Sequence, residues 1–228
     1  MKIQVWDLPL RAFHWLLAIA VATAFVSAQI GGNAMVWHGR AGLAVIALLG
    51  FRIAWGFVGS TYARFASFVR GPETIRAYLR GEWNGLGHNP LGALSVLALL
   101  TLLAAQAASG LFANDDISYQ GYLYPLVGAD LSARLTGIHK LFEPLLILLV
   151  TLHLGAIAYY VRVKKDNLVK PMLTGWKPAP EPAIESPRGG GVVAFVVAAA
   201  IAAVTVYAAS GALLPSPPLP AAAEAPAF

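Results

Sequence analysis

The chain has 228 residues, of which 58% are hydrophobic and 12% are charged, and its net charge is +5. Because this share of charged residues is too small to cover the surface of a water-soluble protein of this size, the composition predicts an integral membrane protein. The sequence contains no cysteine, which excludes disulfides, iron–sulfur clusters and thioether-linked haem, so any metal site must use nitrogen or oxygen ligands.

Five stretches are predicted to cross the hydrocarbon layer, which takes a helix of about 20 mostly apolar residues. They are residues 12–30, 41–51 (the uncharged centre of a second span), 90–113, 144–161 and 189–214. We therefore predict an all-α integral membrane fold, a four-helix bundle followed by a fifth C-terminal transmembrane helix. Residues 13–29 also have the apolar character of a signal-peptide core. They are long for such a core, and we expect them to form the first helix.

Proline, glycine and asparagine mark where the helices begin and end. Pro9 stands near the start of the first helix. In the loop after the second helix, "PETIRAYLRG" predicts a short interfacial helix, with Pro72 in its first turn and Gly81 past its end. Asn89 suits the cap and Pro90 the first position of the third long helix.

The predicted domains follow from these elements. They are a four-helix domain at residues 1–170, a Pro-rich cytoplasmic linker at 171–188, the fifth transmembrane helix at 189–214 and a Pro/Ala-rich periplasmic tail at 215–228.

The basic residues predict the orientation. With a cytoplasmic N-terminus, the outer segments hold only Arg40, Arg134 and Lys140. The inner segments then hold Lys2, Arg11, Arg64, Arg70, Arg76, Arg80, Arg162, Lys164, Lys165, Lys170, Lys177 and Arg188. The positive-inside rule thus predicts a multi-pass protein with a cytoplasmic N-terminus and with its C-terminus on the outer side of the membrane. The basic charge records this topology and does not indicate a nucleic-acid partner; the chain's immediate surroundings are membrane lipid.

Four of the five histidines belong to predicted spanning helices, where polar groups are costly and usually functional. His153 follows His139 by 14 residues, which returns it to within ~40° of the same helix face and roughly 21 Å deeper. His38 lies at the outer depth opposite His139, and His14 at the inner depth opposite His153. Facing imidazoles at two depths predict two haems, each held by two histidines in a helix bundle. His88 has no partner in this scheme and is expected to be an ordinary residue at a helix entrance.

Two alternatives compete with this interpretation. Each histidine could be a lone polar residue satisfied by a hydrogen bond or by lipid headgroups. The four could also serve a non-haem metal transporter, but a transport path needs carboxylates or thiols beside them, and Glu143 is the only acid well inside a span. Next to haem, Glu143 could accept a proton from a quinol or orient a ligand.

Haem propionates are anionic and need cations near the membrane surfaces. The candidates are Arg40, Arg134 and Lys140 at the outer depth and Arg11 and Lys164 at the inner depth. Arg52 follows His38 by 14 residues, so it shares that histidine's face at the depth of the inner haem. The alternative for Arg52 is that it snorkels to the inner surface.

Several motifs in order resemble the bacterial cytochrome b-561 family, which includes the b-type cytochrome subunits of nickel–iron hydrogenases. They are "VWDLPLRAFHW", "FRIAWGFVGSTYARFASFVRGP", "LGHNPLGAL" and "HLGAIAYYVRVKKDNLVKPMLTG", and the resemblance covers residues 3–175. It implies that His14 and His153 ligate an inner haem b, and His38 and His139 an outer one.

The resemblance also implies a function. Members of the family carry electrons between the membrane quinone pool and a redox partner, here expected to be a periplasmic c-type cytochrome or a dehydrogenase. A related possibility is a haem-bearing anchor for a periplasmic oxidoreductase or hydrogenase complex. The fifth helix and the long outer loop exceed the family core and are expected to serve docking; quinone oxidoreductase activity and a homodimer stay open.

Overall fold

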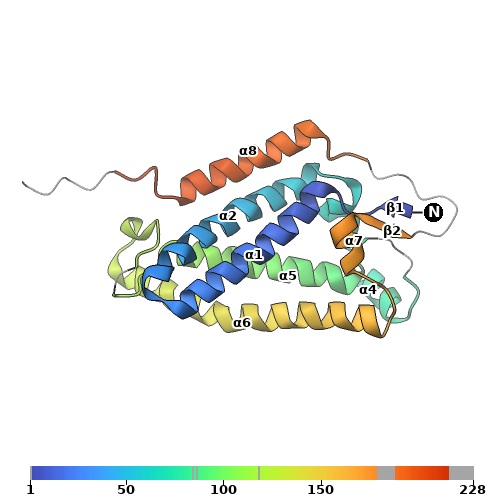
Figure 1. Cartoon of the computed structure of the whole chain (residues 1–228), viewed down its shortest axis with the longest axis horizontal. Coiled ribbons are helices and arrows are strands. Elements are labelled where there is room, and N and C mark those ends of the chain that lie inside the picture. Colours follow the sequence, from blue (N-terminus) through green and yellow to red (C-terminus); the bar gives the residue numbers. More distant parts are fainter. Residues whose placement is uncertain (1, 84, 86, 118, 179–187, 216–228) are drawn as a thin grey trace, which may run out of the picture.

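The computed structural model describes residues 2–83, 85, 87–117, 119–178 and 188–215. Its five long helices run side by side along the longest axis (Figure 1). They are α1 (Leu8–Ile30), α2 (Met35–Val58), α5 (Pro90–Gly110), α6 (Ala129–Arg162) and α8 (Val192–Ala209). Each is long and apolar enough to cross a membrane, and the all-α fold with five spans is confirmed.

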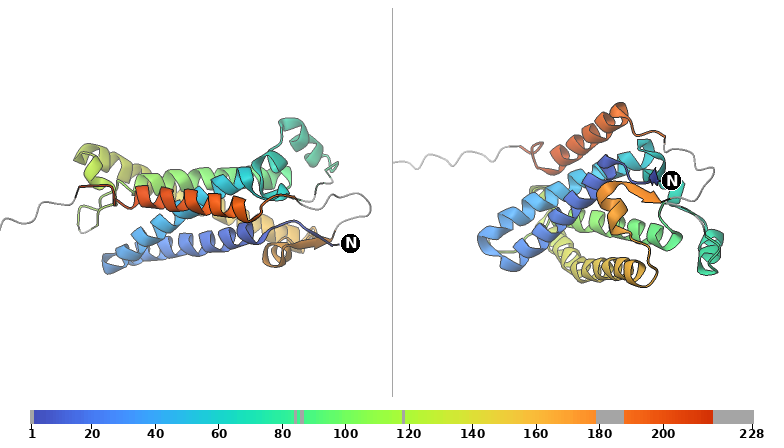
Figure 2. Two further views of the ribbon diagram at one scale, coloured as in Figure 1. Left: turned by 90° about the horizontal axis from the view of Figure 1, so that it is seen from above. Right: turned by 45° about the vertical axis from the view of Figure 1, so that its right-hand side comes forward.

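Short elements gather at the two ends of the bundle. They are β1 (Lys2–Gln4), η1 (Gly32–Ala34), η2 (Thr61–Ala63), α3 (Phe65–Phe68), α4 (Pro72–Leu79), η3 (Tyr124–Leu126), α7 (Val169–Thr174) and β2 (Trp176–Pro178). Following the predicted orientation, the inner end is the one with β1, β2, α4 and α7, and the outer end is the one with residues 111–128. Figure 2 shows these two groups at opposite ends of the long helices.

The predicted helix signals lie where expected. Proline occupies the first turn of α1, α4 and α5. Asn89 caps α5 by accepting a hydrogen bond from the Gly92 amide at 2.7 Å, and Gly81 follows α4 with a φ of +80°, a left-handed conformation that glycine adopts at little cost. Local sequence chemistry therefore suffices to set these boundaries.

A two-stranded sheet at the inner end was not predicted. β1 pairs antiparallel with β2, with Ile3 opposite Lys177. Next to it, Arg11 donates a hydrogen bond from Nη1 to the Leu173 carbonyl oxygen at the end of α7. The first residues of the predicted linker, 171–178, thus contain the rest of α7 and β2. Its remainder up to residue 187, and the tail beyond residue 215, lie outside the described residues.

Asp7 joins the start of α1 to the end of α2. Its carboxylate accepts hydrogen bonds from the Leu10 amide at 2.7 Å, from Trp55 Nε1 at 3.0 Å and from Ser60 Oγ at 2.5 Å. The first bond caps α1, and the other two fix where α2 leaves the bundle. Trp55 itself is fully buried, so its indole N–H needs this partner.

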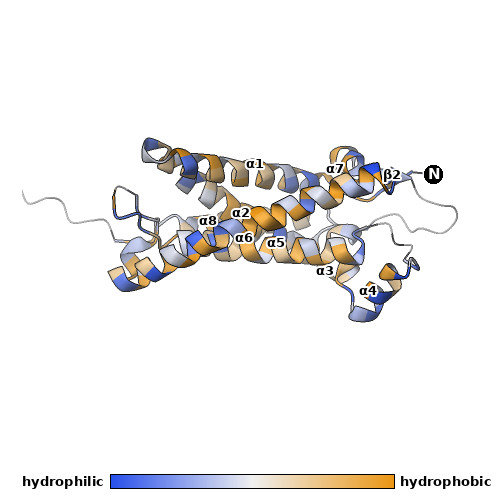
Figure 3. Ribbon diagram, turned by 90° about the horizontal axis from the view of Figure 1, so that it is seen from below, coloured by the Kyte–Doolittle hydropathy of each residue, from blue (hydrophilic) through white to orange (hydrophobic). Residues whose placement is uncertain are grey.

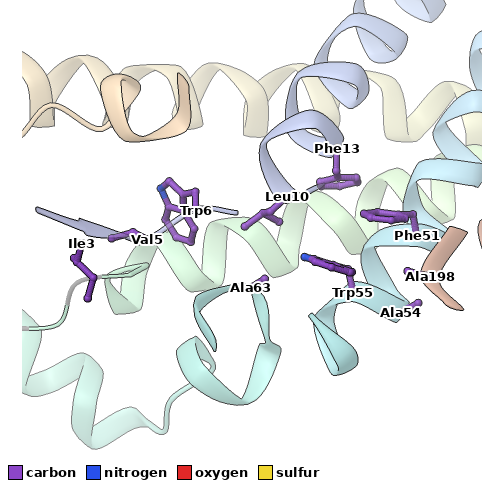
Figure 4. Packing of buried hydrophobic residues seen from close by; sticks show 10 residues of the cluster. All are labelled: Ile3, Val5, Trp6, Leu10, Phe13, Phe51, Ala54, Trp55, Ala63 and Ala198. Carbon is purple, nitrogen blue, oxygen red and sulfur yellow. The ribbon is translucent and has the colours of Figure 1, made fainter. Parts of the chain in front are cut away.

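A hydrophobic cluster surrounds this junction. Figure 4 shows residues of the N-terminal segment, α1, α2, η2 and α8 converging on it. Phe51 stacks on Trp55 with ring centroids 5.6 Å apart, and Ala198 of α8 is fully buried against the same cluster. This packing attaches the fifth helix to α2.

The four helices of the core are not packed uniformly. α2 packs against α1, α5 and α8, and α5 packs along α6, whereas α6 makes few contacts with α1 and α2. At mid-depth, Leu146 of α6 packs against a cluster formed by Ala20, Val45, Leu49 and Leu103. Leu146 is midway in sequence between His139 and His153. The long helices are predominantly apolar on their outer surfaces, whereas α4 is polar (Figure 3).

Candidate functional site

At the outer end, the structure brings the imidazole rings of His38 of α2 and His139 of α6 close together. Their ring centroids are 5.9 Å apart, and the ring planes are nearly perpendicular at 86°. Each metal–nitrogen bond would be about 2 Å long, and each ring centre lies about 1 Å beyond its nitrogen, so two imidazoles that share one metal have ring centres about 6 Å apart. The spacing of this pair therefore fits a metal held between two imidazoles.

Hydrogen bonds set which nitrogen of each ring is available. Nδ1 of His38 lies 2.8 Å from the carbonyl oxygen of Ala24 in α1, and Nδ1 of His139 lies 2.8 Å from that of Gln106 in α5. A carbonyl oxygen only accepts, so Nδ1 carries the proton in both rings and Nε2 keeps its lone pair. This is the arrangement by which a second partner orients a metal-binding histidine.

Two glycines leave room for the side chains of neighbouring elements at this level. A Cβ on Gly110 would lie 2.8 Å from Cε1 of His139, and a Cβ on Gly39 would lie 2.3 Å from the Tyr119 hydroxyl. Tyr119 comes from the outer loop, and its ring meets the His38 ring edge-on at 6.3 Å. Burial, helped by Tyr122 and Asp115, raises the pKa of Tyr119 to about 12, so its hydroxyl stays protonated. Sequence reasoning missed Tyr119, because loop residues carry no periodic signal.

Other polar groups of the outer half lie around these two histidines. The Gln106 side-chain nitrogen is 3.3 Å from Nε2 of His139, a long contact. Farther down α6, Glu143 accepts a hydrogen bond from Gln29 of α1 at 3.0 Å. The intramembrane carboxylate is thus satisfied by a neutral amide from a facing helix, which lowers the cost of holding it there.

At the inner end, His14 of α1 and His153 of α6 lie within electrostatic range of each other. Nδ1 of His14 is buried and has no partner within the described part of the chain. The His14 ring packs edge-on against Trp15 at 5.1 Å. The structure thus brings the two outer histidines together and keeps the inner two within electrostatic range, at opposite ends of the core. Their assignment as haem ligands stays a prediction.

Arg52 is a buried cation at the inner level. Only 2% of the residue is exposed, and its Nη1 has no hydrogen-bond partner among the described residues. Its guanidinium lies over the rings of Phe65, at 4.7 Å, and Phe68, at 5.9 Å. A buried cation that lacks an ion pair requires an anion, and Arg52 therefore does not snorkel to the surface.

The other predicted cations have different surroundings. Nη1 of Arg11 is engaged by α7, while its Nε is buried without a partner in the described chain. Arg40 lies over its neighbour Trp37 at 5.2 Å, and Lys140 is exposed. The two ion pairs found among the described residues, Arg80–Glu82 and Lys177–Asp166, involve none of these.

His88 is the histidine for which the sequence suggested no role, and the structure packs it into the inner end. Its ring lies against Trp6 at 4.6 Å and Phe68 at 4.8 Å, and its Nδ1 is buried with no partner among the described residues. Burial, and secondarily Arg52, His153 and His14, lowers the pKa of His88 to about 3. The two aromatic neighbours are far from it in sequence, so no local pattern could reveal this position.

Together these residues fit haem better than a bare metal ion. Within the described ranges, no group of three or more His, Cys, Asp or Glu side chains could hold a metal ion. The histidines instead come in twos, from helices that make few contacts with each other, and a buried cation, Arg52, lies at the inner level. Paired imidazoles, apolar walls and cations are what a flat anionic macrocycle requires.

Comparison with known proteins leads to the same class. The chain is 26% identical to the probable Ni/Fe-hydrogenase B-type cytochrome subunits of Azotobacter chroococcum mcd 1 and Azotobacter vinelandii, over 77% of this chain and 88% of each relative. No solved structure matches it. The family described as prokaryotic cytochrome b561 matches residues 5–175, three quarters of the sequence. The chain therefore belongs to the prokaryotic cytochrome b561 family and is a haem-bearing electron-transfer protein of the membrane.

Proposed function

We propose that this protein carries electrons through two b-type haems between the membrane quinone pool and a periplasmic redox partner. His38 and His139 hold the outer haem, and His14 and His153 the inner one. The observation that carries the proposal is the outer pair, whose rings are 5.9 Å apart and whose Nδ1 atoms both lie 2.8 Å from a helix carbonyl. The orientation is that of a bacterial inner-membrane protein with a cytoplasmic N-terminus, which the distribution of basic residues supports.

The chain's residues have separate tasks in this mechanism. Bound haem supplies reversible one-electron transfer. Two histidines would hold the iron of each haem and would leave oxygen no place to bind on it. The carbonyls of Ala24 and Gln106 keep the outer imidazoles in the correct tautomer. Arg52 compensates propionate charge at the inner level, while Arg11, Arg40 and Lys140 supply cations nearer the two membrane surfaces. The cluster around Leu146 separates the levels, which α6 sets roughly 21 Å apart.

A second candidate function is a haem-bearing anchor that connects a hydrogenase or dehydrogenase to quinone. The names of the two relatives favour it, because both are described as probable hydrogenase cytochrome subunits. The outer loop offers a docking surface, since Ile117 is 90% exposed there. Co-purification of a second redox subunit with a tagged chain, at a fixed ratio, would favour this alternative over a freely diffusing periplasmic partner.

The test is to count haem in purified protein by the pyridine haemochromogen assay. We expect two b haems per chain in the wild type. His139→Ala removes the outer haem and His14→Ala the inner one, so each variant keeps one haem with its own reduction potential. Leu152→Ala is the matched control, because Leu152 neighbours His153 on α6 but is 59% exposed. One haem in the wild type, or two in either histidine variant, would contradict the pairing.

The quinone is tested separately from the haems. Inverted membrane vesicles that contain the protein are mixed with a reduced short-chain quinol, and the reduction of haem is followed by its visible absorbance. We expect rapid haem reduction in the wild type and in the Leu152→Ala control, and its loss in His14→Ala. This result would support electron exchange with quinone at the inner level. No quinol-dependent reduction in any variant would contradict the quinone assignment and leave the haem assignment intact.

A further inference from the structure

The inner end holds two buried side-chain nitrogens that have no partner among the described residues and that lie near the same aromatic ring. Arg52 Nη1 is a donor, and His88 Nδ1 donates when it carries the ring proton. Nη1 of Arg52, on α2, and Nδ1 of His88, on the loop before α5, are both buried without a partner among the described residues. The Phe68 ring of α3 lies 5.9 Å from the Arg52 guanidinium carbon and 4.8 Å from the His88 ring centroid. Buried donors without acceptors are rare in native proteins, so two near one ring indicate a shared acceptor.

Asp7 does not provide that acceptor in this structure. Asp7 acts on Arg52 electrostatically, but its oxygens already accept from the Leu10 amide, Trp55 Nε1 and Ser60 Oγ. It also forms no ion pair with Arg52, since the ion pairs within the described residues are both elsewhere. The charge of Arg52 and the donor of His88 are therefore left for a group other than Asp7.

The position of His88 specifies that group. His14 and His153 are both close enough to His88 to act on it electrostatically, so His88 lies beside the inner histidine pair. The His88 ring is held between Trp6 and Phe68. This packing restricts the orientation of the imidazole. An anion beside both inner histidines and both free donors is, in a haem protein, a propionate carboxylate.

We propose that His88 is a further cofactor-binding residue of the inner haem, and that together with Arg52 it binds one propionate of that haem. The inference rests on the proposed function, because it requires a haem between His14 and His153. Arg52 supplies the compensating charge, and His88 supplies a hydrogen bond from Nδ1.

The experiment compares two substitutions in the full-length protein. His88→Phe keeps an aromatic ring between Trp6 and Phe68 but has no donor. His88→Asn puts an amide nitrogen near the position of Nδ1. Each variant is assayed for haem content, for the potential of each haem by redox titration, and for the propionate bending band by resonance Raman spectroscopy. The His139→Ala background, which holds the inner haem alone, assigns the signals.

We expect His88→Phe to keep both haems, to shift the inner haem to a lower potential and to move its propionate band, because a propionate that lacks a donor disfavours the extra electron. His88→Asn should restore both signals toward the wild type, and the outer haem should not change. Loss of the inner haem in His88→Phe, recovered in His88→Asn, would support the same role.

Three results would overturn the proposal. The first is an inner potential and propionate band that stay unchanged in His88→Phe. The second is an equal disturbance in both variants, which would mean that His88 acts by packing. The third is a changed quinol dependence with unchanged haem signals, which would assign His88 to the neighbouring cavity of about 230 Å³ that it lines with Tyr62 and Trp83. A wild-type protein without haem would refute the proposed function itself, whatever the His88 variants do.

Discussion

Single residues at the outer level decide how closely the loop approaches the histidine pair. Gly39 follows His38 directly, and its missing side chain makes room for the Tyr119 hydroxyl. Tyr119 in turn covers the edge of the His38 ring. Gly39 has no distinguishing feature in the sequence. In the structure it is the contact point between α2 and a loop more than 70 residues away.

Gly39→Ala should therefore destabilise the protein, by about 1–3 kcal/mol as for other overpacked sites. The reason is steric, since the new methyl would lie 2.3 Å from the Tyr119 hydroxyl and 3.2 Å from Cζ. Tyr119→Phe removes the closest atom, so the double variant should be less destabilised than the sum of the singles. Thermal unfolding in detergent, followed by haem absorbance, measures all four proteins. Additive effects would mean that the two residues do not meet.

At the scale of elements, the fifth helix is an addition to a core that the other four form. Among the long helices, α8 packs mainly on α2, with Ala198 in the cluster around Trp55 and Thr205 against Gly50. The remaining face of α8 is exposed and apolar, as for a helix surrounded by lipid. The histidine levels lie between α6 and the α1–α2 pair, so α8 stabilises the scaffold without contributing a histidine.

This arrangement makes a matched prediction for α8. Ala198→Val overfills a position that is fully buried and should lower stability by about 1–3 kcal/mol. Ala200→Val makes the same change on the same helix at an exposed position and should alter stability by no more than about 0.5 kcal/mol. Thermal unfolding measures both, and the haem content of both should equal that of the wild type. Equal melting temperatures for the two variants would contradict the packing of α8 on α2.

For the whole molecule, the orientation that we propose in the membrane rests on charge. The inner end carries most of the basic residues, and the absence of cysteine allows single cysteines to report on each side. Ile117→Cys, at a residue 90% exposed at the outer end, should react with an impermeant maleimide in intact spheroplasts. Arg80→Cys, at the inner end with its side chain 66% exposed, should react only after lysis. The wild type should not react, and the reverse pattern would invert the topology.

The sequence by itself determined the membrane class, the number of spans and the proline-marked starts of α1, α4 and α5. It also predicted the division of the histidines into two depths. These depend on local quantities, namely the length of apolar stretches, the position of prolines and glycines, and the rise and turn of one helix. The family followed from motifs at specific positions along the chain.

Only the tertiary structure decided the details that make the histidines a site. These details join residues that are distant in sequence. They are the carbonyls that orient His38 and His139, the aromatic rings that bury Arg52, and the contacts of His88. The β1–β2 pairing was missed for the same reason, since three-residue strands have no pattern until the chain brings them together. Depth is a property of one helix, whereas a hydrogen bond or a packed ring requires the relative placement of several, and no local pattern encodes that placement.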